Sequence, residues 1–452
     1  MRHFIKLMLL AVLLSAAGGI GIGASSAEEL AEMAQTRAMS LQQALELARA
    51  ENPELLIGRA RKTRAEATRL RTRQGFLPTI SLDASYLHAD FGLLENVPGI
   101  APGIPPVLTW RDLNPVEGNI VGVQLVQPLV NLGAWHARAQ AGLQENAAAL
   151  GLRRIESEVV VATLEAYFGA ATAQRQVTAE KAGRATAARA LRQAEAAFDE
   201  GLVAPLDVLK ARTRVAEMEA RVALAESRVI AAQSLLRQVL GIDDEAPLLL
   251  TDTVPEPPQL VPREETVHAR HDVQALEEGV KAAEAGVLRA RAAYLPDINI
   301  IARYQRAEFN QPLSFHETDW LIAINLGWKL FAGFGQAGEL GQARAEEQEA
   351  RVELGRLQRR ARAEVRNSHA AWRAELFGWQ RASSSIEDAE EALAFSEGRY
   401  EEGLSDMTEL LRAQAEVLAA RTREINARYN ALVAAQRYRL AVDDEDVERW
   451  WQ

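Results

Sequence analysis

The positions of the prolines constrain this chain more than any other feature. All 16 prolines fall outside three long stretches, 129–204, 206–246 and 313–452. Proline removes a backbone donor and clashes with the preceding turn, so helix interiors rarely contain it. We therefore predict long helices within these stretches. Five prolines crowd into 247–262 and predict an irregular connector over 247–265.

Three matched segments show that the two halves of the chain repeat one another. They are Leu77-Pro78 with Leu295-Pro296, Asn52-Pro53-Glu54 with Arg270-His271-Asp272, and Phe198-x-x-Gly201-Leu202 with Tyr400-x-x-Gly403-Leu404. The first two pairs lie 218 residues apart and the third 202, because the first half has a longer loop around 91–118. A repeat this long indicates two copies of one supersecondary unit. We predict a first repeat over 28–246 and a second over 266–442.

Each repeat contains two runs in which apolar and polar residues alternate. This period of two predicts half-buried strands, at about 77–90, 119–130, 295–308 and 319–331. Trp320 and Trp328 share one face, and eight residues at ~3.3 Å each separate them by ~26 Å. That distance is close to the ~25 Å apolar band, flanked by aromatic residues, of a membrane-spanning sheet. We therefore predict Tyr86, Tyr304, Trp320 and Trp328 at membrane interfaces.

The predicted helices carry apolar residues at alternating steps of three and four, which is typical of coiled coils. In the first half the stripe runs from Val215 to Val239, and in the second half Leu411, Leu418, Ile425 and Leu432 are seven residues apart. We predict helical hairpins over 133–241 and 335–440. A helix over 133–199 is ~100 Å long at 1.5 Å per residue. The shorter helices predicted at 41–76 and 266–294 complete each layer by stacking end to end on the returning helices.

Composition excludes several classes of protein. The chain has 51 Lys and Arg against 62 Asp and Glu, a net charge of −11, which argues against a nucleic-acid partner. It has no cysteine, so disulfides and thiolate sites are excluded. His268 and His271 lie three residues apart without a third ligand, and we expect them to be solvated. We find no catalytic grouping and expect no enzyme activity, metal or cofactor.

The two ends of the chain have their own signals. Residues 1–27 combine a short basic start, an apolar run and small residues before Ala27, which predicts a secretory signal peptide. Residues 443–452 form an acidic C-terminal tail. We expect the mature chain to begin after the signal and to function outside the cytoplasm.

The order of these motifs resembles the TolC family of outer-membrane efflux proteins over residues 41 to about 440. The resemblance rests on Ser40-Leu41-x-x-Ala44-Leu45-x-x-Ala48, on Gln127-Pro128-Leu129, and on the duplicated segments described above. It implies a mixed α and β membrane protein, a homotrimer in which each chain gives four strands to one 12-stranded transmembrane β-barrel. A long periplasmic α-helical coiled-coil tunnel, built from the two repeats, would continue the barrel. Four strands are too few to close a membrane barrel, so a monomeric barrel is excluded.

The resemblance also assigns a function and its sites. It implies the passive exit duct of a tripartite efflux or type I secretion system, located in the outer membrane and extending into the periplasm. Gly201, Leu202, Gly403 and Leu404 would form the hairpin tips that dock a periplasmic adaptor, which joins the duct to an inner-membrane pump. The periplasmic gate candidates are Asp207, Lys210, Glu409 and Arg412. We expect the two basic residues to pair with the carboxylates three residues before them, or with the neighbouring helix.

Two other classes of protein share part of this pattern. A periplasmic adaptor also has a long helical hairpin, but only one, between halves of a β-domain. An exported structural coiled coil would have the stripe without the strands. The duplication, with two hairpins and two strand pairs, favours the channel over both.

Overall fold

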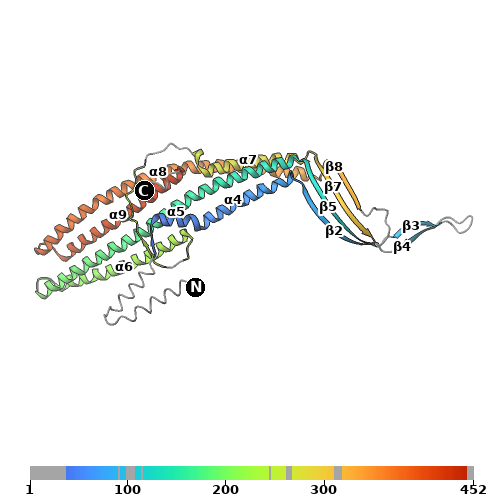
Figure 1. Ribbon diagram of the computed structural model, residues 1–452. Helices are drawn as coiled ribbons and strands as arrows, with labels where there is room; N and C mark the ends of the chain where they lie inside the picture. Colours follow the sequence, from blue (N-terminus) through green and yellow to red (C-terminus); the bar gives the residue numbers. More distant parts are fainter. Residues whose placement is uncertain are drawn as a thin grey trace, which may run out of the picture.

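The computed structural model describes residues 37–89, 92–97, 107–112, 116–243, 246–260, 267–309 and 318–444. The predicted signal peptide and residues 445–452 of the predicted tail lie outside these ranges. The described chain is elongated, with a curved sheet at one end and two helical hairpins at the other (Figure 1). The sheet and the hairpin tips are therefore opposite ends of one long body.

The main sheet has four antiparallel strands in the order β2-β5-β7-β8. The strands are β2 (Thr79–Ala89), β5 (Val116–Val130), β7 (Asp297–Phe309) and β8 (Thr318–Gly327). The central pair, β5 and β7, joins the two repeats. Strand β8 ends before the predicted residue 331 because the chain turns toward the next helix through Gly333 and Phe334, whose φ angles are +56° and +66°.

A second hairpin occupies the loop predicted around 91–118. It pairs β3 (Gly92–Val97) with β4 (Val107–Asp112) in antiparallel register. These strands do not join the four-stranded sheet. The longer connection of the first half therefore contains a short hairpin of its own, outside the main sheet.

The two long hairpins consist of four helices. They are α5 (Leu132–Asp199) with α6 (Pro205–Leu240), and α8 (Gly335–Glu401) with α9 (Met407–Ala441). The predicted stripes face the interior: Met218, Val222 and Leu236 are buried in α6, and Leu418 and Leu432 are buried in α9. The coiled-coil prediction is thus confirmed for both returning helices.

Shorter helices complete the layer next to the sheet. They are α3 (Leu41–Glu51), α4 (Pro53–Arg71) and α7 (His271–Ala292), with short 3-10 turns η1 (Thr72–Gly75) and η2 (Val267–Ala269). The single helix predicted over 41–76 is interrupted because Pro53 starts a new helix, with Asn52 as its N-cap. Helix α5 packs against α4 and α7, and α7 against α8. The order α4-α5-α7-α8 therefore repeats the order of the strands.

Each returning helix stacks end to end on a short helix, as the lengths predicted. At the first junction, Asn52 Nδ2 donates to the carbonyl of Val239 at the end of α6 (2.6 Å). At the second, Arg270 Nη1 donates to the carbonyl of Ala441 at the end of α9 (3.1 Å). Asn52 and Arg270 are equivalent positions of the two repeats. Each side chain satisfies a carbonyl that the helix end would otherwise leave without a partner.

The second junction is a buried charge network. Arg270 is only 2% exposed and forms ion pairs with Asp272 (2.8 Å) and Glu364 (3.3 Å). Burial raises the pKa of Asp272, but the hydrogen bond and charge of Arg270 outweigh it and hold that pKa below its ordinary value. Asp443 lies 2.6 Å from His271 Nδ1. The expectation that His271 is solvated was wrong, because this contact leaves its side chain only 17% exposed.

A small parallel sheet closes the middle of the body. It pairs β1 (Arg37–Met39) with β6 (Leu248–Leu250), so the predicted connector is not irregular throughout. The hydroxyl of Tyr167 on α5 donates to Asp252 (2.8 Å), which also accepts the backbone N–H of Leu41 (2.6 Å). The connector is therefore fixed to the long helix.

Candidate functional site

The four-stranded sheet has one apolar and one polar face, and its apolar face is exposed. Residues opposite one another in an antiparallel sheet share a face, so Leu82, Val123, Tyr304 and Trp320 form one apolar row. Their exposed fractions are 72%, 43%, 55% and 76%. The other face carries the row Ser81, Gln124, Arg303 and Leu321, and the row Asp83, Gly122, Gln305 and Asp319. Such an apolar face suits contact with lipid rather than water.

The four predicted interface aromatics lie at different heights on the sheet. Tyr304 and Trp320 are directly opposite each other, whereas Tyr86 pairs with Asn119 further from the helices. Trp328 follows β8 at the helix end, where its Nε1 donates to the carbonyl of Tyr294 (3.1 Å). All four side chains are more than half exposed.

The sequence analysis missed further aromatic residues at the boundary between sheet and helices. Phe76 and Trp135 are in edge-to-face contact, with ring centroids 5.2 Å apart, and Phe331 and Phe334 are in the same kind of contact at 5.6 Å. Trp135, Phe331 and Phe334 are 61%, 74% and 78% exposed. Their closeness to the strand ends is the signal that could have identified them. Like Trp328, they lie where the strands meet the helices.

The two hairpin tips have the same backbone turn. Gly201 and Gly403 have φ angles of +74° and +72°, in the left-handed region that favours glycine. The residue after each glycine donates its backbone N–H to the fifth residue before it, Leu202 to Ala197 and Leu404 to Arg399, both at 2.8 Å. Leu202 and Leu404 are 73% and 64% exposed. The residue after each turn glycine is thus a leucine exposed to its surroundings.

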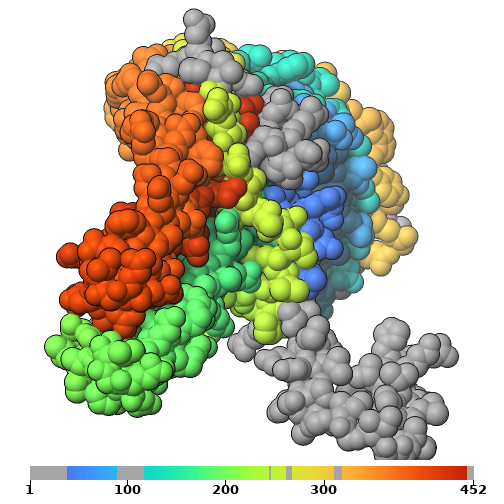
Figure 2. Space-filling model, turned by 90° about the vertical axis from the view of Figure 1, so that its left-hand side faces the viewer, coloured from blue at the N-terminus to red at the C-terminus, as the bar shows by residue number. Residues whose placement is uncertain are grey.

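The tips of the two hairpins lie side by side (Figure 2). A shared apolar cluster joins them, in which Val208 and Ala211 of α6 and Met407 and Leu410 of α9 are buried. Ala194 of α5 completes the cluster. The packing fixes the relative height of the two matched tips.

The four gate candidates are arranged unequally. Lys210 lies 3.6 Å from Asp207, as predicted, and also donates to Thr408 of the second hairpin (2.9 Å). Glu409 pairs with Arg399 of its own hairpin (3.8 Å) rather than with Arg412. Arg412 is exposed and has no ion pair to another described residue. The structure therefore brings three of the four side chains into contacts and leaves Arg412 alone.

Tyr400 is a residue of the tip region that the sequence analysis matched only as part of a repeat. Its hydroxyl is buried and has no hydrogen-bond partner in the described part of the chain. Burial, and then the nearby charge of Asp207, raise the pKa of Tyr400. An unpartnered buried hydroxyl beside a carboxylate could not have been found from sequence spacing, because it depends on how the hairpins pack.

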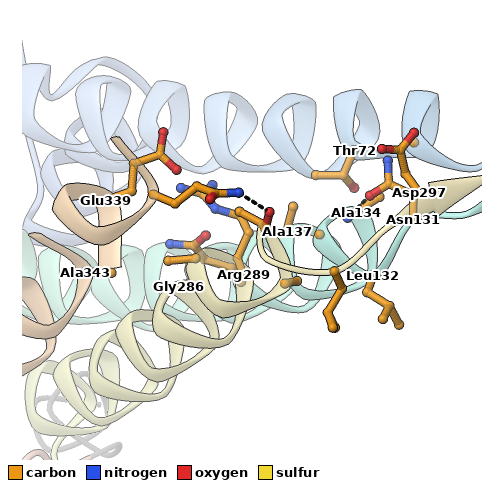
Figure 3. Close-up of a pocket in the computed structure, with 18 of the residues that line it drawn as sticks. Thr72, Asn131, Leu132, Ala134, Ala137, Gly286, Arg289, Asp297, Glu339 and Ala343 are labelled. Atoms are coloured by element: carbon orange, nitrogen blue, oxygen red, sulfur yellow. Dashed lines mark hydrogen bonds between the residues drawn. The ribbon is translucent and has the colours of Figure 1, made fainter. Parts of the chain in front are cut away.

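A hollow of about 1110 Å³ lies where the helices meet the sheet (Figure 3). Residues of α4, α5, α7 and α8 all contribute to it, so it follows the concave side of the four-helix layer. Its lining is polar and charged, with Arg71, Arg289, Asp297, Glu339 and Glu346 among the residues. It thus continues the polar face of the sheet toward the hairpins.

Among the described residues, no helix combines the length and apolar character that crossing a membrane requires. Within the same ranges, no group of three or more His, Cys, Asp or Glu could hold a metal ion.

The family model described as "Outer membrane efflux protein" matches residues 44–242 and 263–442, which are most of the chain. The chain belongs to the outer membrane efflux protein family. Protein CyaE of Bordetella pertussis is 29% identical over 414 residues, covering 86% of this chain and 80% of that protein. Outer membrane protein TolC of Escherichia coli is 22% identical over 421 residues, covering 88% and 81%. The Campylobacter jejuni CmeC outer membrane channel superimposes with a TM-score of 0.75 at 16% identity, covering 89% of this chain and 85% of CmeC.

Family membership confirms the resemblance drawn from the motifs. This outer membrane efflux protein is an exit channel of the cell outer membrane. The two alternatives, a periplasmic adaptor and an exported structural coiled coil, are thereby set aside. The likeness to CmeC supports the fold, with its sheet at one end and long helices at the other.

Proposed function

We propose that three copies close their sheets into one 12-stranded barrel, and that the helical layers continue this barrel as a duct into the periplasm. One observation carries the proposal: within the described ranges, the sheet with the exposed apolar face ends at β2 and β8, whose outer edges are unpaired. Unpaired backbone groups at a sheet edge are costly in lipid, which offers no hydrogen bonds. Neighbouring copies would supply the missing partners.

The strand directions permit this closure. Adjacent strands alternate in direction, so β8 runs opposite to β2. Strand β8 of one copy can therefore pair antiparallel with β2 of the next, and the ring closes with antiparallel pairs throughout. The polar row of Asp83 and Gln305 then faces the interior, and the row of Leu82 and Trp320 faces lipid. The number three is what the family resemblance implies.

Light scattering of the detergent-purified protein tests this assembly. The expected result is three chains per particle from an outer-membrane fraction, with channel conductance in planar bilayers. A monodisperse monomer would contradict the proposal, because four strands cannot close a barrel.

The hairpin tips dock a periplasmic adaptor, which links the duct to an inner-membrane pump. Support comes from the two exposed leucines, Leu202 and Leu404, held by identical turns at matched height. Exposed apolar residues at such a position are natural contacts for a partner. Neither leucine belongs to the buried cluster that joins the tips.

Leu202→Asp and Leu404→Asp should reduce export and adaptor crosslinking without reducing the number of trimers in the membrane. Leu224→Asp is a matched control, because Leu224 is 54% exposed on α6 but lies far from the tip. If the tip variants lose trimers, or if Leu224→Asp has the same effect on export, the leucines are not specific docking residues. Gly201 and Gly403 would then serve only the turns.

The same tips form the closed gate. Asp207 and Glu409 bring six carboxylates from three copies to one end of the duct. Like charges repel, and Lys210, held between Asp207 and Thr408, offsets part of this repulsion. A mixed ring binds divalent cations less tightly than a purely acidic one.

Conductance recordings test the gate. Replacing both Lys210 and Arg412 by Asp should strengthen the block by divalent cations added from the tip side. If conductance and block stay unchanged, these four residues do not line the constriction and are surface ion pairs.

A further inference from the structure

In the part of the chain that the structure describes, the four-helix layer next to the sheet has two free edges, α4 and α8. We propose that α4 of one copy packs against α8 of the next, with Leu70 and Leu56 seated on Gly341 and Gly355. This inference rests on the proposed ring and names the surfaces that hold it together. The partner is a second copy of this chain.

The free side of α4 is apolar. Leu55, Gly58, Lys62 and Ala65 alternate at steps of three and four, and these are the less exposed positions that face α5. The opposite side carries exposed apolar side chains, of which Leu56 and Leu70 are 46% and 58% exposed. Ile57, Ala60 and Ala67 lie on the same side. A charged helix with one exposed apolar stripe is typical of a helix that packs against a neighbour.

The free side of α8 carries three glycines, Gly338, Gly341 and Gly355, together with the exposed side chain of Val352. Gly338 and Gly341 have no heavy atom within 4 Å of where a Cβ would be, and Gly355 has only Arg359 of its own helix. Each glycine in a helix interior costs about 0.5–1 kcal/mol relative to alanine. Three within 18 residues (338–355) therefore lower the stability of this helix in the single chain. The glycines leave a shallow surface that a neighbouring helix can approach closely.

Contacts between neighbouring helices set the heights of these residues along the layer. Gln336 Nε2 donates to the carbonyl of Ala293 (2.6 Å). Gly286, seven residues before Ala293, faces Gln140, which places Ala293 level with Gly133 on the antiparallel α5. Gly75 packs against Ala134, which is the residue after Gly133 on α5. Gln336 and Gly75 therefore lie at about the same height.

Counting from that level pairs the two edges. Helices α4 and α8 run in opposite directions, so we count forward from Gln336 and backward from Gly75. Five residues along each helix, Gly341 lies at the height of Leu70. Nineteen residues give Gly355 opposite Leu56. Rotation about the duct axis keeps heights unchanged, so the same pairs meet between neighbouring copies. Both pairs are separated by 14 residues, two coiled-coil heptads.

Charge supports the same register. Arg64 and Arg71 are exposed on α4, seven residues apart, and Glu339 and Glu346 are exposed on α8 with the same spacing. The level of Arg71 is that of residue 340 and the level of Arg64 is that of residue 347. None of the four has an ion pair with a described residue, and Glu346 accepts a hydrogen bond only from Gln342 of its own helix (2.9 Å). The edges are thus complementary in charge at matched heights.

The four charged residues also lie on the same side of the helical layer. Arg71, Glu339 and Glu346 all line the large hollow, and Arg64 lines a smaller one that shares Thr68 and Gln144 with it. The basic and acidic residues therefore lie on the concave side of the layer. They would meet along the inner rim of each seam, beside the apolar contact.

Cysteine crosslinking tests the register in a chain that has no cysteine of its own. Leu70→Cys combined with Gly341→Cys should give covalent trimers under mild oxidation, because the two positions are on opposite edges of one chain and meet only between copies. Leu70→Cys with Gly355→Cys is the matched control, since its cysteines are offset by ~21 Å along the helix. It should give no crosslink.

A charge-exchange experiment tests the ion pairs. Arg64→Glu with Arg71→Glu should lower the yield of trimers at least about fivefold at low salt. Adding Glu339→Arg and Glu346→Arg should restore it. A reversal without effect, or one that the exchange does not rescue, would overturn the ion pairs.

The outcomes separate this inference from the proposed ring. Three chains per particle with no Leu70–Gly341 crosslink would overturn the seam but leave the ring. A wild-type protein that is monomeric in detergent would overturn both. A crosslink in the offset control as well would show that the pairing is unspecific and would overturn the register.

Discussion

The two repeats have the same backbone plan but different chemistry at their junctions. In the first repeat a neutral amide, Asn52, joins α6 to α4, and Gly241 provides the left-handed residue with φ of +72°. In the second, Arg270 and Asp443 occupy the equivalent positions, and Asp443 also has a positive φ of +54°. A duplicated fold therefore needs the same hydrogen bond to a helix end at both places, but not the same side chain.

This difference predicts how much stability each junction loses when its side chain is removed. A neutral cap leaves little behind when it is removed, whereas a buried ion network leaves uncompensated charges. The second junction should thus be the more sensitive one, although its helices have nearly the same lengths as those of the first.

Removing Arg270 should produce the largest effect. Arg270→Ala leaves Asp272 and Glu364 without their partner, and we expect the free energy of unfolding to fall by about 3–5 kcal/mol. Asn52→Ala removes one cap and should cost about 1–2 kcal/mol. Chemical denaturation of the detergent-purified variants measures both. Equal losses would show that the charge network adds nothing beyond the shared hydrogen bond.

Gly241→Ala should rank second, at about 2–3 kcal/mol, since a left-handed conformation costs non-glycine residues about 1–2 kcal/mol. An added Cβ there would also collide with the backbone of Glu51. Gly201→Ala is the control, because Gly201 has a similar φ of +74° but open space around it. If both variants lose the same stability, the close approach at the first junction is unimportant. Asp443 tolerates a side chain because it points to His271 and Arg154.

The two basic residues of the tips differ in their contacts, and this difference predicts a smaller effect. Lys210 contacts both Asp207 and Thr408, so Lys210→Met should lower the free energy of unfolding by about 0.5 kcal/mol, the range of partly exposed ion pairs. Arg412→Met should cause no measurable change. The same denaturation experiment compares them. A larger loss from Arg412→Met would mean that Arg412 has a partner in the assembled protein.

The smallest effect concerns pH at the second tip. Asp406 accepts the backbone N–H of Glu409, and this hydrogen bond is the main cause that lowers the pKa of Asp406. The ionised cap therefore stabilises α9 above the ordinary pKa of about 3.9 and this stabilisation is lost as pH falls through the lowered folded value. The first tip has Ala204 at its N-cap, without a side-chain hydrogen bond.

Hydrogen exchange of peptides from the two tips measures this difference. Protection at the start of α9, corrected for intrinsic exchange, should fall below about pH 4, while α6 should not change in the same way. Asp406→Asn keeps a capping oxygen that does not titrate and should remove the pH dependence. If the dependence persists in that variant, another group is responsible.

Much of the site could be predicted from particular residues. The glycines at 201 and 403 predicted matched turns, and both have the positive φ that the turn needs. The alternation from Trp320 to Leu326 predicted a face that the cross-strand register confirms. Short-range patterns of this kind predict the structure correctly because the backbone period itself decides which side chains share a face.

Contacts between distant segments were not predicted. Glu409 pairs with Arg399 of the other helix of its own hairpin rather than with Arg412 of the same helix. Tyr400 has a buried hydroxyl near Asp207 of the first hairpin, and this depends on how the two hairpins pack. The same holds for His271, which Asp443 covers. Periodicity describes one helix at a time and carries no information about such neighbours.

The sequence by itself determined the elements of this protein: long helices where proline is absent, strands where apolar residues alternate, and two copies of one unit. Only the tertiary structure decided that β5 pairs with β7 and that α4-α5-α7-α8 repeats the strand order. It also decided that α4 and α8 are the free edges. The physical reason is that local propensity fixes a segment's own conformation, whereas its neighbours are chosen by burial over the whole chain.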